Sequence, residues 1–208
     1  MTCEALKHQI IEILRREYSA GMINLFEGNV SARLGSRIFI TPSQVSKLAT
    51  TEDMLIETDP EGNIIELPEG LRPTTELKMH LELYRLRPDV NAVVHNHPVF
   101  ATAFAMNHLP IASDALTELN LTLKDIPVAS YGTPGTEELY ADFERLLPVT
   151  NGLLLANHGL ITYGRDLETA YSYAEAAEKS AKTIFIAKLL GDPKAIPAEK
   201  LAELKRAL

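Results

Sequence analysis

Two histidines stand two residues apart in the stretch AVVHNHPV, residues 92–99. Side chains alternate along a β-strand, so His95 and His97 would point to the same face of the sheet. A third histidine, His158, lies in the apolar run GLLLANHGLITYG, residues 152–164. Three neutral imidazoles suit zinc or a similar first-row ion and leave one coordination position open for chemistry. Ordinary hydrogen-bonded histidines at strand ends would have the same spacing, so these residues alone leave both interpretations open.

The chain has six histidines, and we expect the other three to have no ligand role. His8 falls on the polar side of a predicted amphipathic helix and is expected in solvent. His80 and His108 are expected to be structural, because a histidine near apolar sequence is more often a hydrogen-bonded core residue than a ligand.

Three polar stretches are suited to binding an anion such as phosphate. They are EGNVSAR (27–33), FITPSQ (39–44) and RPTTEL (72–77), and their candidate residues are Gly28, Asn29, Ser43, Gln44, Thr74 and Thr75. Backbone N–H groups at a glycine can approach a ligand closely, and the start of a helix attracts phosphate through its free N–H groups and its dipole. Each stretch also has a purely structural interpretation, as a turn, a loop or a helix cap.

Glu76 follows the two threonines, in the first turn of a predicted helix. A carboxylate at this place commonly does no more than complement the helix dipole. Beside a metal ion and a bound carbonyl group, the same carboxylate could remove a proton as a general base.

Composition limits the classes of function that the chain can have. The protein has 208 residues, of which 46% are hydrophobic and 23% charged, values typical of a folded globular domain. The net charge of -8 disfavours general nucleic-acid binding, which requires clustered Lys and Arg. Cys3 is the single cysteine, so an intrachain disulfide is excluded, and we expect a reducing, cytoplasmic setting. We find no signal peptide and no membrane-spanning run, and we expect no membrane association.

The elements that must position these residues follow from hydrophobic periodicity and turn signals. The pattern predicts helices over residues 6–18, 75–86, 98–107, 114–123, 135–147, 166–190 and 198–208. It predicts strands at 93–97 and 126–131, two strands within each of 29–40 and 152–164, and a hairpin over 54–67. Helices and strands interleave without a linker or a repeat, so we expect one layered α/β or α+β domain over residues 1–208.

Five short motifs occur in the order found in the class II aldolase/adducin family. They are Gly28-Asn29-Val30-Ser31, Thr41-Pro42-Ser43, Pro73-Thr74-Thr75-Glu76, His95-Asn96-His97 and Ala156-Asn157-His158-Gly159. The chain therefore resembles that family from about residue 5 to residue 190. Five motifs in the right order are far more specific than any one of them.

The resemblance implies a three-layer α/β/α sandwich around a mostly antiparallel central sheet. It implies a homotetramer with active sites at subunit interfaces and one divalent ion per subunit, most often Zn²⁺, with Mn²⁺ or Co²⁺ as alternatives. The residues that match the family's metal ligands are Glu76, His95, His97 and His158, and Glu76 would leave the ion to act as the base. The residues that match its phosphate pocket are Gly28, Asn29, Ser43, Gln44, Thr74 and Thr75.

The activity that the resemblance implies is metal-dependent cleavage of a ketose 1-phosphate to dihydroxyacetone phosphate and an aldehyde, through an enediolate stabilised by the ion. Two other reactions use the same scaffold, dehydration of methylthioribulose 1-phosphate and 4-epimerisation of a sugar phosphate. Epimerases of the family carry Asp where this chain has Glu76, which favours the aldolase branch. An adducin-like binding module without catalysis is the alternative from another class.

The chain departs from the family pattern in four places, of which the first is Thr74-Thr75, where the family often has Ser-Ser. Gln44 stands where relatives often carry Gly, and Asn96 and Pro98 stand where Thr and Ser are more familiar. Fuculose-phosphate aldolases of the family donate a proton from tyrosines, but residues 111–119 contain none and none follows Tyr173. Asp114 or Glu118 of a neighbouring subunit could replace them. We therefore expect a smaller or 5-deoxy ketose 1-phosphate as the substrate.

Overall fold

The apolar runs of the sequence form one continuous sheet in a computed structural model that describes residues 1–123 and 125–206. Its strands, within these residues, lie in the order β4-β3-β2-β1-β5-β8-β7-β6. Their bounds are β1 Asn29–Leu34, β2 Arg37–Ile40, β3 Ile56–Thr58, β4 Ile64–Glu66, β5 Ala92–Asn96, β6 Val128–Ala129, β7 Gly152–Leu155 and β8 Gly159–Gly164. All neighbouring pairs are antiparallel except β6 and β7, which confirms the predicted mostly antiparallel sheet.

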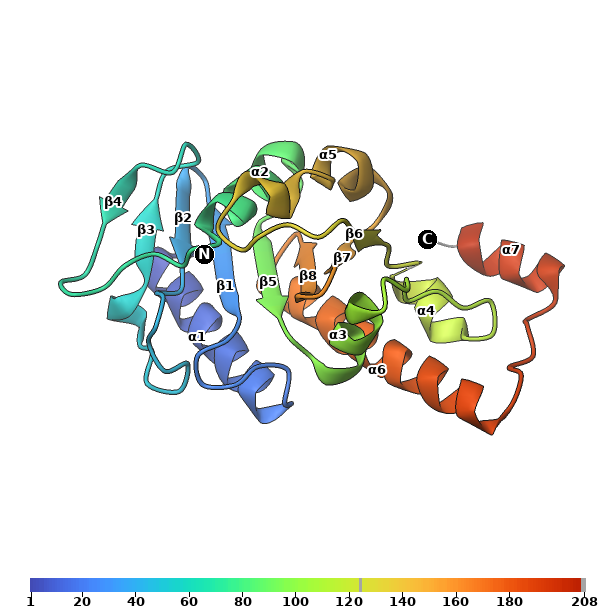
Figure 1. Ribbon diagram of the computed structural model, residues 1–208. Coiled ribbons are helices and arrows are strands. Elements are labelled where there is room, and N and C mark those ends of the chain that lie inside the picture. Colours follow the sequence, from blue (N-terminus) through green and yellow to red (C-terminus); the bar gives the residue numbers. More distant parts are fainter. Residues whose placement is uncertain (124, 207–208) are drawn as a thin grey trace.

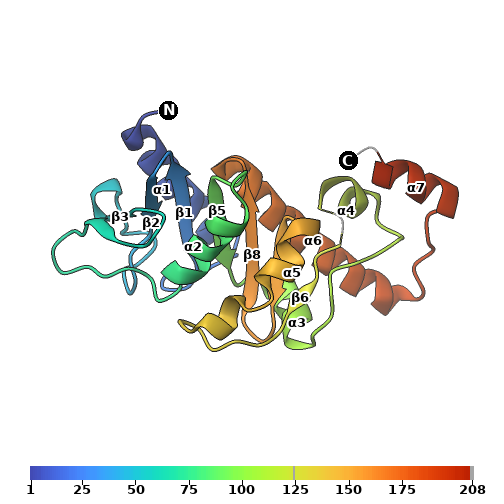
Figure 2. The same ribbon diagram turned by 90° about the horizontal axis from the view of Figure 1, so that it is seen from above.

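Helices cover both faces of this sheet. Their bounds are α1 Cys3–Ser19, α2 Leu77–Leu86, α3 Val99–Met106, α4 Thr117–Thr122, α5 Phe143–Leu146, α6 Leu167–Leu190 and α7 Ala198–Arg206. Figure 1 shows α2 and α5 on the side of the sheet opposite α1 and α6, and Figure 2 gives the view from above. None of the helices in the described part of the chain combines the length and apolarity that crossing a bilayer requires.

Two hydrophobic cores follow from the alternation of side chains along the strands. Val94 belongs to the core under α1, α3 and α6, and its neighbour Val93 belongs to the core under α2 and α5. Both valines are fully buried, so β5 is covered on both faces. Continuous apolar sequence is typical of strands in this position, and the three-layer α/β/α architecture is confirmed.

The sheet register brings distant motifs to one end of the central strands. Asn29 of β1 lies opposite His95 of β5, and on the other side of β5 Asn96 pairs with Leu160 of β8. The connection between β7 and β8 contains His158, so this histidine emerges beside the end of β5. The candidate residues therefore meet because antiparallel pairing fixes which ends of these strands are adjacent.

The largest error of the sequence interpretation is the helix predicted over residues 135–147. The structure divides this segment into a 3₁₀ helix Glu137–Tyr140, the short helix α5 and a 3₁₀ helix Leu147–Val149. The side chain of Asp142 accepts a hydrogen bond from the Ser130 N–H at 2.7 Å, which ties the segment to the end of β6. The backbone of Glu138 also packs against Gly132, where a Cβ atom would lie 2.3 Å away. These tertiary contacts outweigh the local helical pattern.

Several boundaries differ in smaller ways. Helix α2 begins at Leu77 rather than residue 75, which leaves Glu76 as its N-cap residue. Helix α4 begins at Thr117 rather than residue 114, and β6 contains only two residues. The last predicted helix extends to residue 208, and residues 207 and 208 lie outside the described part. For the site, the first difference matters, because the Glu76 side chain projects from the very start of the helix.

Candidate metal centre

Three imidazole rings meet at the end of β5. The ring centroids of His95, His97 and His158 lie 4.8 to 5.0 Å apart. One nitrogen from each ring belongs to a set of atoms that all lie within 4.8 Å of one another. His97 follows the last residue of the strand and is held there by its N–H group, which donates to the Met22 carbonyl at 3.0 Å. The predicted convergence of the three side chains is confirmed.

A hydrogen bond to the backbone orients one of these rings, and a carboxylate lies near the outer nitrogen of a second. His95 donates from Nδ1 to the Leu160 carbonyl at 2.9 Å, so its Nε2 carries the free lone pair. His97 places Nδ1 3.5 Å from the Glu27 carboxylate, which leaves its Nε2 directed at the cluster. The two Nε2 atoms are 3.1 Å apart. Partners on the far ring nitrogen of this kind are typical of histidines that bind a metal.

The Glu76 carboxylate lies between two of the imidazoles. Its Oε2 is 3.3 Å from His95 Nε2, and its Oε1 is 3.3 Å from His158 Nε2. Burial raises the pKa of Glu76, but His95, the hydrogen bond from Asn29 and His158 outweigh burial and lower that pKa to about 2. Burial also lowers the pKa of His95 to about 3. At neutral pH His95 is therefore neutral and Glu76 is ionised, which are the protonation states of metal ligands.

The donor set fits a divalent cation. Three imidazole nitrogens and one carboxylate oxygen match the ligand types and number that zinc takes in tetrahedral sites. His158 turns its Nε2 to Glu76, while its buried Nδ1 lacks a hydrogen-bond partner among the described residues. The residues present are therefore suited to holding a cation such as zinc.

Asn96 lies outside this cluster although it separates two of its histidines. Alternation along β5 turns its side chain to the other face, where Nδ2 donates to Glu17 Oε1 at 2.8 Å. Burial raises the pKa of Glu17 to about 8. The departure from the more familiar Thr at this position therefore affects the packing behind the site and adds no group to it.

The residues predicted to bind phosphate lie on three adjoining loops. Asn29 Nδ2 donates to Glu76 at 2.7 Å and to Thr74 Oγ1 at 3.3 Å, which joins the first loop to the third. The Ser43 N–H donates to the Arg72 carbonyl at 2.9 Å, which joins the second loop to the third. The structure thus brings the three loops together beside Glu76.

Backbone conformation explains two of these positions. Gly28 has φ +73°, and a Cβ atom there would lie 2.6 Å from Ile23 Cγ2 and 2.9 Å from the His95 carbonyl oxygen, so a glycine is required. Gln44 has φ +57°, the left-handed conformation that favours glycine, which is the residue that the family resemblance led us to expect there. Its Oε1 accepts a hydrogen bond from the Arg72 guanidinium.

Sequence analysis missed several polar residues near the cluster. Arg72 is exposed beside Gln44 and supplies positive charge next to the predicted phosphate pocket. Lys47 is buried, and burial lowers its pKa although Glu17 and Glu76 attract the charged form. His80 and Tyr84 lie on the same face of α2 as Glu76, and the signal that could have revealed them is their spacing of four and eight residues from Glu76.

We expect Gly159→Ala to weaken metal binding. A Cβ atom at this position would lie 2.5 Å from the Asn96 carbonyl oxygen and 2.5 Å from His97 Cδ2, so either the strand pairing or the His97 ring must move. Disturbing the contacts that orient a metal-binding side chain typically lowers metal affinity by about 10- to 100-fold. Competition with a chelator measures the change in zinc affinity.

Gly152→Ala is the matched control, because Gly152 lies at the far end of β7 and its Cβ would meet Thr162 Cγ2 at 3.2 Å. We expect this variant to keep its zinc affinity. Equal affinities of the wild type and Gly159→Ala would contradict the assignment of His97 as a ligand.

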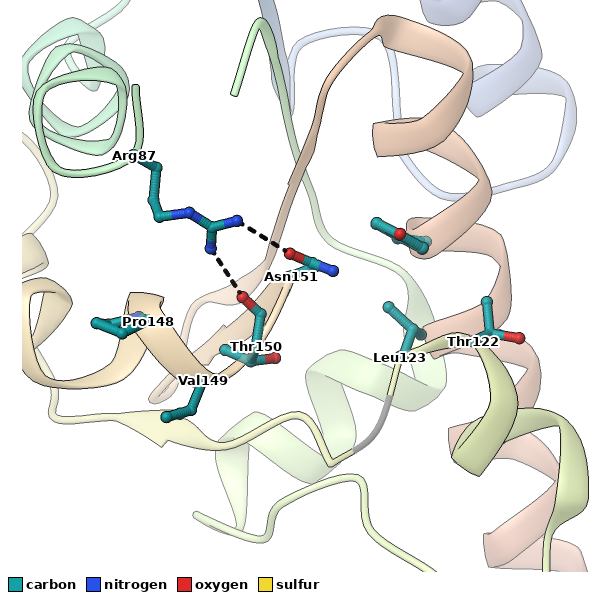
Figure 3. Close-up of a pocket in the computed structure, with 8 residues that line it drawn as sticks. Arg87, Thr122, Leu123, Pro148, Val149, Thr150 and Asn151 are labelled. Carbon is teal, nitrogen blue, oxygen red and sulfur yellow. Dashed lines mark hydrogen bonds between the residues drawn. The ribbon is translucent and has the colours of Figure 1, made fainter. Parts of the chain in front are cut away.

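A separate cavity of about 240 Å³ lies at the opposite end of the same strands (Figure 3). Arg87 donates to the Thr150 carbonyl at 3.3 Å and to Asn151 Oδ1 at 3.4 Å. The same guanidinium binds both carboxylate oxygens of Asp89. Because these polar groups already form hydrogen bonds with one another, the cavity is less suited to binding and activating a substrate than the histidine cluster.

Comparison with known proteins agrees with the family resemblance that the sequence motifs indicate. The family model described as "Class II Aldolase and Adducin N-terminal domain" matches residues 8–185. A protein of Methanococcus maripaludis named L-fuculose phosphate aldolase is 33% identical over 178 residues, which cover 86% of this chain and 95% of that protein.

A second relative comes from Rhodospirillum rubrum and is named 5-methylthioribulose-1-phosphate/5-deoxyribulose-1-phosphate aldolase. It is 30% identical over 197 residues, which cover 95% of this chain and 88% of that protein. Among solved structures, one titled L-fuculose 1-phosphate aldolase aligns with a TM-score of 0.89 and 28% identity, covering 98% of this chain and 95% of that one.

Proposed function

The chain belongs to the class II aldolase and adducin family, and we propose that it is a divalent-metal-dependent aldolase that cleaves a ketose 1-phosphate to dihydroxyacetone phosphate and an aldehyde. The observation that carries this proposal is the meeting of three imidazoles with Glu76, beside three loops suited to phosphate. A binding module without catalysis would have no need of this arrangement.

We propose zinc as the cation, with manganese or cobalt as alternatives, and four residues would hold it: His95, His97, His158 and Glu76. When bound, the cation would supply Lewis acidity, polarising the substrate carbonyl group and stabilising the negative charge that develops as the C3–C4 bond breaks. As the C3–C4 bond breaks, the C4 hydroxyl would lose its proton to Asp114 or Glu118 of a neighbouring subunit, and C3 of the product would gain a proton from Glu76. In the reverse reaction Glu76 would remove that proton from C3.

The three loops would bind the substrate phosphate. Hydroxyl groups of Ser43, Thr74 and Thr75 and backbone N–H groups around Gly28, Asn29 and Gln44 would donate hydrogen bonds to its oxygens. A phosphate held at a fixed distance from the cluster orients C3 toward Glu76, so remote binding energy lowers the barrier of the reaction.

Two features support a 5-deoxy or otherwise small ketose 1-phosphate as the substrate. The printed name of the R. rubrum relative includes 5-deoxyribulose 1-phosphate. Residues 111–119, the stretch matched to one proton-donating tyrosine of fuculose-phosphate aldolases, also contain no tyrosine. We propose that residues 1–208 act as one domain in a homotetramer, in which Asp114 or Glu118 of a neighbouring subunit faces the site.

A panel of ketose 1-phosphates, assayed with zinc-loaded protein for every product, tests this function. We expect dihydroxyacetone phosphate from at least one 5-deoxy ketose 1-phosphate. Loss of water from methylthioribulose 1-phosphate, without dihydroxyacetone phosphate from any compound, would assign the chain as a dehydratase. Formation of a C4 epimer alone would assign it as an epimerase.

A further inference from the structure

A continuous line of hydrogen bonds leads from Glu76 into the protein interior. Asn29 Nδ2 donates to Glu76 Oε2 at 2.7 Å, and Asn29 Oδ1 lies 2.5 Å from His80 Nε2. The other ring nitrogen of His80, Nδ1, lies 2.7 Å from Ser31 Oγ, which in turn lies 2.8 Å from the Tyr84 hydroxyl. All five side chains are buried. We refer to these residues as the Tyr84–Glu76 chain.

Two secondary-structure elements, β1 and α2, supply all five residues of the Tyr84–Glu76 chain. Asn29 and Ser31 are two residues apart on β1 and therefore share one face of the sheet. Glu76, His80 and Tyr84 are spaced by four residues at the start of α2 and along it, so they share one face of the helix. The hydrogen bonds of the Tyr84–Glu76 chain thus run along the contact between β1 and α2, inside a core that is otherwise apolar.

Donor and acceptor chemistry fixes the direction of every bond. The ionised Glu76 carboxylate can only accept, so the amide nitrogen of Asn29 faces it and the amide oxygen faces His80. His80 must then carry its proton on Nε2, which leaves Nδ1 to accept from the Ser31 hydroxyl. Ser31 in turn accepts from the Tyr84 hydroxyl. Every donor therefore points toward Glu76, and hydrogen bonds aligned in this way polarise one another.

The amide of Asn29 is the place where this direction matters. Its two N–H bonds are both used, one on Glu76 and one on Thr74 Oγ1 at 3.3 Å. The oxygen and nitrogen ends of an amide have nearly the same shape, so packing alone does not distinguish them. If the amide turned over, its carbonyl oxygen would face the Glu76 carboxylate and repel it.

We propose that His80 is a positioning residue that fixes the Asn29 amide with its N–H group on Glu76, so that the carboxylate keeps the orientation that proton transfer requires. The inference rests on the proposed function, in which Glu76 is the base. His80 touches neither the substrate nor the cation in this account, and it acts through Asn29 alone.

The first test compares His80→Leu with His80→Gln. Gln can place its amide N–H near the position of Nε2 and so keep the donor to Asn29, whereas Leu removes it. For zinc-dependent exchange of the C3 proton of dihydroxyacetone phosphate, we expect kcat of His80→Leu to fall about 10- to 100-fold with KM and bound zinc near the wild-type values. We expect His80→Gln to recover most of kcat.

Two further variants on α2 serve as comparisons. Tyr84→Phe removes the most distant donor of the chain, so we expect a smaller loss of kcat than in His80→Leu. Lys78→Ala changes an exposed residue of the same helix and should leave kcat unchanged. If His80→Leu does not fold, His80→Asn replaces it, because Asn reaches only as far as the Nδ1 position and cannot donate to Asn29.

A second measurement needs neither metal nor activity. In metal-free protein with ¹⁵N-labelled histidine, we expect NMR to show the His80 proton on Nε2, hydrogen-bonded and slow to exchange. A proton on Nδ1 would contradict the donor-to-acceptor direction that we infer for the hydrogen bonds of the Tyr84–Glu76 chain.

The outcomes separate the two proposals. If the wild type exchanges the proton and His80→Leu does so at the same kcat, the positioning role is wrong and the proposed function stands. If zinc-loaded wild type catalyses no exchange, the proposed function is wrong and the positioning role is wrong with it.

Discussion

Glu76→Gln should lower the rate of C3 proton exchange in dihydroxyacetone phosphate by about 10² to 10⁴-fold while zinc stays bound. Gln has nearly the same shape as Glu and keeps an oxygen that can accept from Asn29 Nδ2, which lies 2.7 Å from Glu76 Oε2. It cannot take up a proton at neutral pH, so the base is lost without loss of the surrounding contacts. Incorporation of deuterium from solvent, followed by ¹H NMR, measures the rate.

Glu66→Gln is the control for this experiment, because Glu66 is an exposed carboxylate of β4 that pairs only weakly with Lys7. It should exchange the proton at the wild-type rate. Wild-type exchange by zinc-loaded Glu76→Gln would exclude Glu76 as the base.

His95→Ala should lose both the metal and the activity. His95 is fully buried, and its Nε2 lies 3.3 Å from Glu76 Oε2 and 3.1 Å from His97 Nε2. Its other ring nitrogen is fixed on the Leu160 carbonyl. Removing one ligand of a four-ligand site should lower zinc affinity more than removing a residue that only holds a ligand in place. We therefore expect zinc affinity to fall by more than about 100-fold. Metal analysis after dialysis against a chelator, together with release of dihydroxyacetone phosphate, measures the two effects.

His8→Ala is the matched control, since the His8 side chain is exposed and pairs with Glu12 and Glu52 on the surface. It should keep one zinc per chain. His95→Gln fills more of the buried space and tests the same loss if the alanine variant is unstable. Retention of zinc by either His95 variant would show that the cation binds elsewhere.

The histidine cluster was predictable because its signals are local. Alternation along β5 puts His95 and His97 on one face, and the short connection between two apolar strands places His158 at a strand end. The five motifs in order then implied the ligand set, and the structure brings those side chains within reach of one another.

The surroundings of the cluster were not predictable in the same way. The bond from Asn29 to Glu76 depends on the register of β1 against β5 and on how α2 packs across β1, and neither is a local property. His80 was expected to be structural, and only its contacts on both ring nitrogens show what it supports. The broken helix after Gly135 has the same cause, because the bond between Asp142 and Ser130 overrides local propensity.

The most direct test of the account is a titration of metal-free protein with zinc, with release of dihydroxyacetone phosphate from 5-deoxyribulose 1-phosphate as the signal. We expect no release without metal, an increase in proportion to added zinc, and saturation at about one equivalent per chain, as a site of four protein ligands requires. Full release by metal-free protein would contradict the account, and so would the absence of release at every zinc concentration.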